Sequence, residues 1–443
     1  MLNCTSQENG KVTKEDSVYY QKYLKRKASK DSVRLAKSSA YLNQKLSNRD
    51  TVTILKFKKS PIDILPEQVK EFSKLKKVEF SRCSNLKLDE IIKTLAKIPT
   101  LRTLKINFLS QRIMPESIGR LDQIERLDLA NCKFSDLSDS IIKMIHLRHL
   151  DLRNNPFVKF SNTWENISKI NSLKNLNVSF CQLNEIPQPL FASKSLERID
   201  LSSNVISTFP ETAISAPIKH LNLSYNPKIS QENLFQWLPQ IPLLESLTLR
   251  SLKITVLSEK IGDLKSLNYL DLRENSLKEL PASMGQLVKI EHLNLGNNRN
   301  VISTNQITVI PAFFKNFTRL KYLNLAGNGI QLYPSFMKGL TQLEYLDLSQ
   351  NQFNVVPPEI ASYKNLKHLD LSLNLIGEVT PEIEKLKKLE ELHLDGNFFN
   401  VHIYKIKELP NSIINLPNLK VLSLNDNVIR SLPDSIGAMR SLE

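Results

Sequence analysis

The sequence repeats a pattern with a period of 23 residues, and this repetition constrains the fold more than any other feature. One clear copy has aliphatic residues at Leu267, Leu270 and Leu272, then Asn275, and the next copy starts at Ile290. Sixteen units of this kind begin at Val52, Leu75, Leu101, Ile124, Leu147, Leu173, Leu196, Ile218, Leu244, Leu267, Ile290, Leu320, Leu343, Leu366, Leu389 and Leu419. Such a period indicates a stack of small units, in place of the roughly three globular domains that the chain length alone would suggest.

Each unit has the pattern of one short strand with a single buried face. Positions 4 and 6 are aliphatic, whereas positions 2, 3, 5, 7 and 8 should point to solvent. One unit is too small to bury its own apolar face, so many units must stack in parallel to form a continuous core. The sequence therefore predicts an α/β solenoid in the form of a curved horseshoe. Parallel strands should line its concave face, and short helices and loops its convex face.

A second motif closes many units, as in Leu280 to Gly285 and in Leu432 to Gly437. Together with the preceding LxxLxLxxNxL pattern, it resembles the leucine-rich repeat family, and the LPxxIG form in particular. The resemblance covers about nine-tenths of the chain. It implies a non-enzymatic protein that holds a protein ligand on its concave face. The cysteine-rich caps of extracellular animal and plant members are not visible in the sequence, which favours a bacterial or intracellular type.

Position 9 of the unit is expected to form a buried ladder, because an Asn side chain can bond the backbone groups that a tight turn leaves unpaired. Ten units have Asn there: Asn155, Asn204, Asn226, Asn275, Asn298, Asn328, Asn351, Asn374, Asn397 and Asn427. Three others have Cys83, Cys132 and Cys181. Successive cysteines lie two units apart, about 10 Å, so we expect no disulfide among them.

Some units are longer than the 23-residue norm. Every third unit from Leu75 is extended, and Asp89, Thr163 and Ser230 precede stretches that favour short helices, so we predict that they are N-caps. The units at Ile290 and Leu389 are each seven residues longer than the norm. Their extra segments are expected just after the Asn position, around Asn300 to Asn305 and Val401 to Tyr404, on one rim of the solenoid.

We expect residues 1–51 and residues 52–443 to form different parts of the chain. Residues 1–51 are rich in Lys and Arg and have apolar residues at helical spacing, which favours a basic tether and a helical cap on the first repeat. The alternative is a basic surface for membrane lipid or nucleic acid. Residues 52–443 should form the solenoid of about 16 units. It stops at the start of a seventeenth unit, so we expect the natural protein to be longer.

Because of Cys4, the sequence allows two cellular locations for this protein. As the chain is given, we expect a cytoplasmic protein. The run from Leu2 to Ser6 also looks like the junction of a bacterial lipoprotein, in which the cysteine is acylated, although the hydrophobic leader is missing. The alternative is therefore an exported lipoprotein anchored through Cys4, and a lipid anchor is the only membrane contact that we expect.

The sequence gives no sign of catalysis. It has 11 glycines, no glycine-rich phosphate loop, and no HExxH, CxxC or GxSxG motif. The histidines at position 3, such as His149 and His220, recur about three strands apart, too far for one zinc ion. We therefore predict no enzyme activity, no cofactor, no metal site and no small-molecule substrate.

Charge is uneven along the predicted strand face. The first five units have eleven basic and four acidic residues at solvent positions, and units ten to fifteen have three basic and nine acidic residues. Such asymmetry would orient an extended partner, and salt should screen the effect. The basic residues that we predict to contact a partner are Lys56, Lys58, Lys77, Arg102, Lys105, Arg126 and Arg153. The alternative is drift on a solvated face.

A row of rings overlaps the acidic half. Position 3 reads Tyr269, His292, Tyr322, Tyr345 and His368 over five consecutive units. Tyrosine is favoured at interfaces because it gives a large contact area with little loss of rotamer entropy. With Asp347, Asp370 and the two extra segments, these rings are our predicted partner-binding patch. The alternative is family consensus at this position.

Three functions remain open from the sequence. The first is a non-enzymatic scaffold that binds a protein ligand on the concave face. The second is the recognition part of a larger signalling or surface protein, with an effector domain beyond residue 443. The third is a binder of anionic polymer or membrane through the basic N-terminal half, for which a steep salt dependence would be diagnostic. We do not expect nucleic acid as the ligand.

Overall fold

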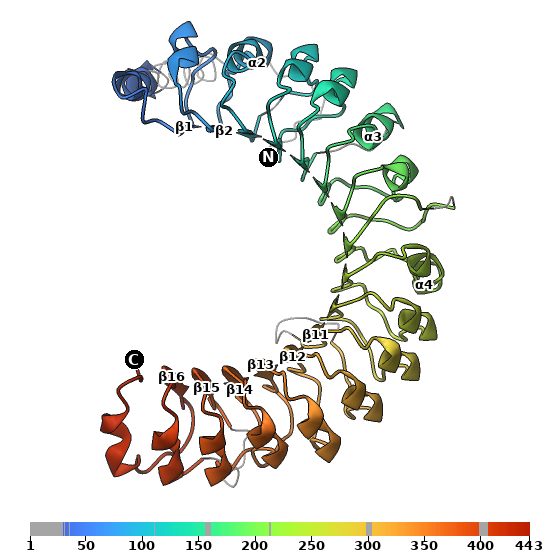
Figure 1. Ribbon diagram of the computed structural model, residues 1–443, viewed down its shortest axis with the longest axis vertical. Coiled ribbons are helices and arrows are strands. Elements are labelled where there is room, and N and C mark those ends of the chain that lie inside the picture. Colours follow the sequence, from blue (N-terminus) through green and yellow to red (C-terminus); the bar gives the residue numbers. More distant parts are fainter. Residues whose placement is uncertain are drawn as a thin grey trace, which may run out of the picture. The chain divides into compact units, whose positions relative to one another are not determined.

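The computed structural model describes residues 30, 32–34, 36–109, 111–155, 161–211, 214–297, 304–397 and 406–443. The chain divides into two compact units, unit 1 (Met1–Leu173) and unit 2 (Lys174–Glu443). In both units, a short strand is followed by a turn and, in nearly every repeat, by a short helix (Figure 1). One parallel strand per repeat confirms the predicted α/β solenoid class.

The strands of unit 1 follow one another in chain order along a parallel sheet. They are β1 (Ile54–Lys58), β2 (Lys77–Ser81), β3 (Thr103–Asn107), β4 (Arg126–Asp128) and β5 (His149–Asp151). The described helices of this unit are α2 (Leu88–Leu95), α3 (Ser161–Ser168) and the 3-10 helices Glu67–Glu71, Glu116–Arg120 and Asp139–Lys143. A helix of residues 36–47 precedes β1.

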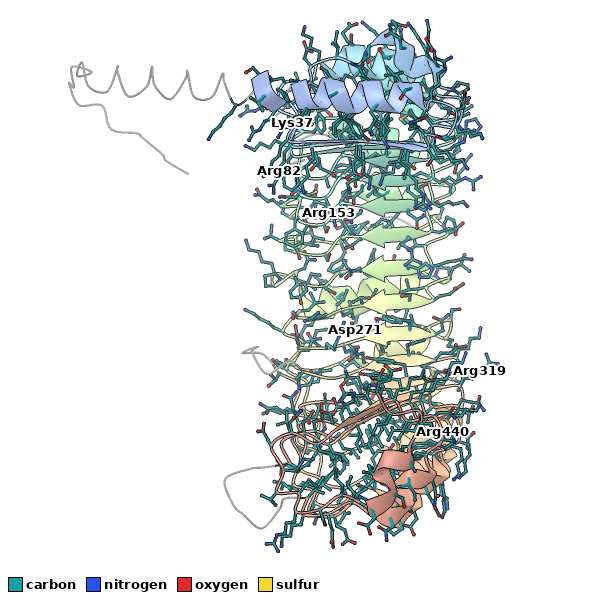
Figure 2. All side chains as sticks on the ribbon, turned by 90° about the vertical axis from the view of Figure 1, so that its left-hand side faces the viewer. Lys37, Arg82, Arg153, Asp271, Arg319 and Arg440 are labelled. Atoms are coloured by element: carbon teal, nitrogen blue, oxygen red, sulfur yellow. The ribbon has the colours of Figure 1, made fainter. Side chains whose placement is uncertain are left out.

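Unit 2 continues the same pattern with more repeats. Its strands are β6 (Asn175–Asn177), β7 (Arg198–Asp200), β8 (His220–Asn222), β9 (Ser246–Thr248), β10 (Tyr269–Asp271), β11 (His292–Asn294), β12 (Tyr322–Asn324), β13 (Tyr345–Asp347), β14 (His368–Asp370), β15 (Glu391–His393) and β16 (Val421–Ser423). Its described helices are α4 (Gln231–Trp237) and the 3-10 helices Gln188–Ala192, Leu238–Gln240, Glu259–Asp263, Ala282–Gln286, Ala312–Asn316, Ser335–Gly339, Pro358–Ser362, Pro381–Lys385, Asn411–Asn415 and Asp434–Ala438. Figure 2 shows the strands of each unit stacked one above another.

The aliphatic positions of the repeats form the core of each unit. Leu270 and Leu272 are 0 % exposed. The strand register pairs Leu270 with Leu247 on one side and Leu293 on the other, so equivalent leucines stack along the unit. Each buried leucine contributes about 2 kcal/mol from the removal of apolar surface from water. The apolar pattern thus fixes which face of every strand points outward.

The predicted Asn ladder is present. The side-chain Nδ2 of Asn351 donates to the backbone oxygens of Leu325 and Leu348, and its Oδ1 accepts from the backbone N–H of Ile330. The same pattern of donation to two carbonyls holds for Asn155, Asn204, Asn226, Asn275, Asn328, Asn374, Asn397 and Asn427.

One position of the ladder differs from the prediction. Asn298 lies outside the described residues, and Asn305 makes the ladder bonds of its repeat. Asn305 Nδ2 donates to the backbone oxygens of Leu272 and Leu295, and its Oδ1 accepts from the backbone N–H of Leu277. The extra residues of this unit therefore precede the ladder residue, whereas the sequence predicts that they follow it. In the unit at Leu389, Asn397 makes the ladder bonds, and the predicted extra segment lies outside the described residues.

The three cysteines occupy the ladder slots that the sequence assigns to them. The thiol of Cys132 donates to the backbone oxygen of Ile106 at 3.0 Å, as an Asn amide would. Cys83 bonds the backbone oxygen of Phe57 in the same way. Burial raises the pKa of the Cys132 thiol to about 12, so this thiol stays protonated and unreactive. Cys83 and Cys132 are buried free thiols, and the buried thiol of Cys181 donates to the backbone oxygen of Ser179 at 3.4 Å.

Of the three predicted N-caps, one is confirmed and two are wrong. Ser230 caps α4, because its side chain accepts a hydrogen bond from the backbone N–H of Asn233. Asp89 lies inside the first turn of α2, whose N-cap is Lys87. Thr163 lies inside α3, where its hydroxyl donates to the carboxylate of Asp136. Helix α2 starts one residue before Asp89, and α3 starts two residues before Thr163. Helix boundaries are uncertain by this amount when they are assigned from the sequence.

In unit 2, the close packing of neighbouring repeats explains why the closing motif has glycine at Gly262. Gly262 lies in the 3-10 helix Glu259–Asp263, against the next repeat. A Cβ atom at Gly262 would lie 2.5 Å from the backbone oxygen of Ser283. Real Cβ atoms do not approach an oxygen so closely, so the repeats could stack only after a backbone shift. A Cβ atom at Gly339, the last residue of the 3-10 helix Ser335–Gly339, would have no atom within 4 Å.

We expect Gly262→Ala to lower the free energy of unfolding by about 1 to 2 kcal/mol, because overpacking displaces backbone. The matched control Gly339→Ala should be neutral or stabilising by up to about 1 kcal/mol, since alanine restricts the unfolded chain. Urea unfolding followed by circular dichroism measures both. Equal effects of the two substitutions would contradict this explanation of the motif.

Candidate functional site

A row of rings crosses five neighbouring strands of unit 2. The ring row consists of Tyr269, His292, Tyr322, Tyr345 and His368, and the register places each ring beside the next. The ring centroids of Tyr322 and Tyr345 are 4.2 Å apart, and those of Tyr345 and His368 are 4.3 Å apart with planes 3° from parallel. The other two steps are 5.7 and 5.6 Å. The predicted side-by-side arrangement is confirmed, and its role in binding stays a prediction.

The rings of this row are held in place but remain accessible. His292 is exposed, and the other four are half-buried. Burial and the nearby Asp347 carboxylate raise the pKa of Tyr345 well above its ordinary value. Its hydroxyl therefore stays protonated at neutral pH and can donate a hydrogen bond. Stacked rings lose little further freedom on binding, which favours affinity.

Asp347 and Asp370 have a structural role that the sequence did not reveal. Oδ1 of Asp347 accepts hydrogen bonds from the backbone N–H and the hydroxyl of Ser349, at 2.9 and 2.7 Å. Oδ1 of Asp370 accepts from the backbone N–H of Ser372 at 2.8 Å. Asp347 is 9 % exposed, and burial, followed by repulsion from Asp370, raises its pKa. Both carboxylates hold the turn after their strand, and their contact with a ligand stays a prediction.

Ion pairs neutralise much of the acidic half. Six of its nine carboxylates pair with a neighbouring cation or histidine: Asp271 with Arg273, Glu274 with Arg250, Glu291 with Lys321, Glu344 with Lys367, Glu390 with Lys420, and Glu391 with His368. Asp347, Asp370 and Asp395 are in none of the ion pairs formed by the described residues. The residual negative charge therefore lies at the β13 to β15 end of the ring row.

The structure adds a residue that the sequence did not single out. His393 lies at position 5 of its repeat, one strand beyond His368, and the two ring centroids are 5.2 Å apart. Glu391 lies between them: its Oε2 is 2.8 Å from Nδ1 of His368 and 3.5 Å from Nε2 of His393. The sequence argument against metals considered only histidines at position 3. The sequence did contain a signal for this contact. Glu391 is the register partner of His368, and His393 follows Glu391 by two residues, on the same face of the strand.

In unit 1, all four acidic residues of the predicted strand face pair with basic neighbours. Lys77 pairs with Glu79, Arg102 with Glu125, Lys105 with Asp128, and Arg153 with Asp151. Seven basic residues of this face take part in no ion pair among the described residues: Lys56, Lys58, Lys59, Lys76, Arg82, Arg126 and Arg148. This face therefore keeps a net positive charge after its ion pairs are counted. The charges of Lys77, Arg102, Lys105 and Arg153 are neutralised by neighbouring carboxylates.

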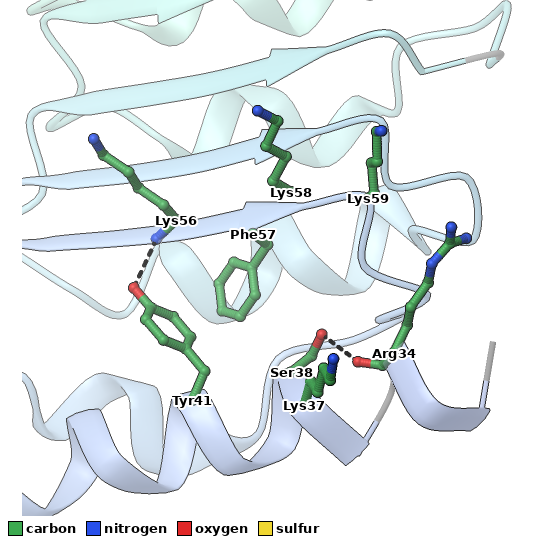
Figure 3. Close-up of a pocket in the computed structure, with 8 residues that line it drawn as sticks. All are labelled: Arg34, Lys37, Ser38, Tyr41, Lys56, Phe57, Lys58 and Lys59. Carbon is green, nitrogen blue, oxygen red and sulfur yellow. Dashed lines mark hydrogen bonds between the residues drawn. The ribbon is translucent and has the colours of Figure 1, made fainter. Parts of the chain in front are cut away.

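Lys56, Lys58 and Lys59 line one pocket together with Lys37, and we call these four residues the basic cluster. Figure 3 shows the last three on β1 and its end, above the helix of residues 36–47 that carries Lys37. The hydroxyl of Tyr41 on this helix accepts a hydrogen bond from the backbone N–H of Lys56 at 3.1 Å. The Tyr41 ring packs edge-on against Phe57 at 5.7 Å. In Figure 2, Lys37, Arg82 and Arg153 lie toward the same edge of the strands of unit 1.

Several predicted features cannot be placed. Cys4, the segment Val401 to Tyr404 and most of the segment Asn300 to Asn305 lie outside the described residues. In the part of the chain that the structure describes, no helix has the length and apolar character needed to cross a membrane.

Comparison with protein families identifies the repeat. Residues 171–227, 242–299, 301–353 and 341–399 match one family described as leucine rich repeat, and residues 146–167 match a second family with the same description. Together these matches cover more than half of the chain. No curated protein matches the sequence.

Comparison with solved structures supports the same fold. A leucine-rich repeat protein of Leptospira interrogans is 26% identical, with a TM-score of 0.66, and the match covers 91% of this chain and 97% of that one. The ectodomain of the receptor kinase GASSHO1/SCHENGEN3 from Arabidopsis thaliana, in complex with Casparian strip integrity factor 2, is 23% identical, with a TM-score of 0.52 and coverage of 90% and 50%. Toll of Drosophila, in the Toll–Spätzle complex, is 18% identical, with a TM-score of 0.57, and the match covers 86% of this chain and 55% of that one.

Proposed function

This chain belongs to the leucine-rich repeat family, and from that premise we propose that it is a non-enzymatic scaffold of the LPxxIG form that binds a protein ligand on the strand face of unit 2. The single observation that carries the proposal is the ring row. Five rings on five adjacent strands form a continuous surface with spacings of 4.2 to 5.7 Å. Tyrosine-rich surfaces of this kind are typical centres of binding energy in protein interfaces.

The ring row suggests the chemistry of the ligand. The stacked rings present apolar edges with the tyrosine hydroxyls and imidazole nitrogens, and the carboxylates of Asp347 and Asp370 add negative charge beside them. An extended segment with apolar and basic side chains would therefore complement this surface. Two solved structures of the same fold, the Arabidopsis ectodomain and Toll, are complexes with named ligands, which agrees with a binding role.

The basic cluster supports a second candidate function, the binding of an anionic polymer or membrane surface by unit 1. Lys56, Lys58 and Lys59 are exposed, and none of them is used in an ion pair among the described residues. Cations without local partners are available to phosphate or carboxylate groups of a ligand. Such binding would be strongly salt-dependent.

Crosslinking followed by titration would test the first candidate. Lys321 and Lys367 are exposed and adjoin Tyr322 and His368, so an amine-reactive crosslinker should join a bound protein at these lysines. Tyr322→Ala, Tyr345→Ala and His368→Ala together should weaken binding of the identified protein at least about tenfold. Phe180→Asn, which removes an exposed aromatic of unit 2 outside the row, should leave binding unchanged.

The same samples separate the two candidates. If Lys56→Gln, Lys58→Gln and Lys59→Gln together abolish binding, and the ring-row substitutions do not, the ligand is held by the basic cluster. Unchanged binding in both sets of variants would contradict both proposals.

A further inference from the structure

Three potential metal ligands converge at the end of the ring row. One ligand atom each of His368, Glu391 and His393 lies within 4.8 Å of the other two. Both imidazoles approach the same carboxylate oxygen, Oε2 of Glu391, at 2.8 and 3.5 Å. The three side chains come from two paired strands, in which Glu391 is the register partner of His368.

This arrangement fits a metal ion better than a simple ion pair. One histidine is enough to pair with a carboxylate, but here a second ring, that of His393 two residues after Glu391 on β15, lies near the same oxygen. Ligands of a tetrahedral zinc ion lie about 3.3 Å apart when the bonds are about 2.0 to 2.1 Å long. The two observed separations lie on either side of this value. Small side-chain rotations would bring the third pair of atoms within range.

We propose that His368, Glu391 and His393 form a binding site for a zinc ion on the strand face of unit 2. Two imidazole nitrogens and one carboxylate oxygen are a donor set that zinc prefers, and magnesium and calcium favour oxygen ligands alone. Three protein ligands leave one position of the zinc ion open to water or to a group of a bound partner. The proposal goes beyond the scaffold function and does not depend on it.

The surroundings of the three ligands favour a cation. The imidazole of His368 is fixed by its stack on Tyr345, 4.3 Å away, so little freedom is lost when it binds a metal. Asp370 is the register partner of His393 and, with Asp347, keeps this part of the face negative. The side chains of His368 and His393 are 20% and 25% exposed, so an ion can reach them from solvent.

Titration of the 443-residue chain, prepared without a histidine tag, with zinc chloride tests the site directly. Isothermal titration calorimetry at about pH 7.5 should show one zinc ion bound per chain. Binding should weaken at about pH 5.5, because histidine must be neutral to bind metal. His393→Ala and Glu391→Gln should each weaken it at least about tenfold. Cobalt in place of zinc should give the strong visible absorption of a four-coordinate ion.

Matched controls keep the test specific. His292→Ala removes a histidine from the same ring row but outside the three ligands, and His220→Ala removes one from β8. Both should bind zinc as the unsubstituted chain does. The proposal is overturned if the unsubstituted chain binds no zinc, if His393→Ala binds zinc unchanged, or if all four variants lose affinity equally. Far-ultraviolet circular dichroism would show whether each variant is folded. Glu391→Gln keeps the number of heavy atoms and is therefore the substitution that disturbs packing least.

Discussion

Replacing Asn275 by alanine should lower the free energy of unfolding by about 3 to 5 kcal/mol, since a buried backbone group without a partner costs about 1 to 3 kcal/mol. Asn275 is 0 % exposed. Its Nδ2 donates to the backbone oxygens of Leu249 and Leu272, at 2.9 and 2.8 Å, and its Oδ1 accepts from the backbone N–H groups of Leu252 and Ile254, at 3.0 and 3.1 Å. Alanine removes these four bonds and a longer one to the backbone oxygen of Arg273, and it leaves the backbone groups inside the solenoid without these partners.

Urea unfolding followed by circular dichroism would measure this loss. Asn184→Ala is the control, because Asn184 is exposed and lies outside the ladder. Its effect should stay within about 0.5 kcal/mol, as for most surface substitutions. A loss below about 1 kcal/mol for Asn275→Ala would mean that water replaces the amide and that the ladder contributes little to stability.

The repeat made most of the fold predictable because its period and its apolar pattern are local properties of the sequence. Leu270 and its equivalents fix the strand register, since a shift by one residue would turn the buried face outward. The placement of Asn305 was not predictable in the same way. The sequence has three asparagines near this position, Asn297, Asn298 and Asn305, and the hydrogen bonds to the backbone oxygens of Leu272 and Leu295 identify Asn305 as the ladder residue.

The candidate site was predictable in part. Position 3 of each repeat must lie on the strand face, so the order of the rings followed from the sequence. The role of Asp347 did not, because its bond to the backbone of Ser349 depends on the backbone at the end of the strand. The meeting of His368 and His393 also depends on side-chain rotamers of two neighbouring strands. Charges counted along the sequence overstate the acidic field for a related reason, since lysine, arginine and histidine side chains pair with six of the nine carboxylates.

The division of labour between strand positions explains how one scaffold can be stable and still variable in what it binds. Position 5 residues such as Asp347 and Asp370 hold the turn, and the ladder residues satisfy the backbone behind it. Position 3 residues such as Tyr322 make neither kind of bond to the backbone. They can therefore change with little effect on folding, and the surface that they form is the part of the face most suited to carry a specific function.

A second large effect is expected at the ion pair of Arg250 and Glu274, which follow β9 and β10. The Glu274 side chain is 2% exposed, and that of Arg250 is 27% exposed. Arg250 Nε donates to Glu274 Oε2 at 2.8 Å, Nη2 donates to Oε1, and the hydroxyl of Ser251 donates to Oε2 at 2.8 Å. Arg250→Met keeps an unbranched apolar stem but leaves a buried carboxylate without its cation. At neutral pH this should lower the free energy of unfolding by about 2 to 4 kcal/mol.

The pH dependence of Arg250→Met distinguishes a lost ion pair from lost packing. In the unsubstituted chain, burial raises the pKa of Glu274, but the hydrogen bonds from Arg250 and Ser251 outweigh it, so the net pKa is lowered. The carboxylate therefore contributes stability that is present above its unfolded pKa, about 4.3, and is lost as the pH falls through the folded pKa. Without Arg250, burial dominates, and the pKa of Glu274 in the folded variant should rise above its unfolded value. Protonation of Glu274 at low pH then removes the cost of burying its charge in the variant.

The difference in unfolding free energy between the two proteins should consequently be largest above about pH 6 and should shrink toward about pH 4. Urea unfolding at the two pH values measures it. Adding Glu274→Gln to Arg250→Met should recover part of the loss at neutral pH, because the amide carries no charge into the buried site. A difference that is the same at both pH values, with no recovery in the double variant, would show that Arg250 acts through packing against Tyr225, whose ring centroid lies 5.4 Å from its guanidinium carbon.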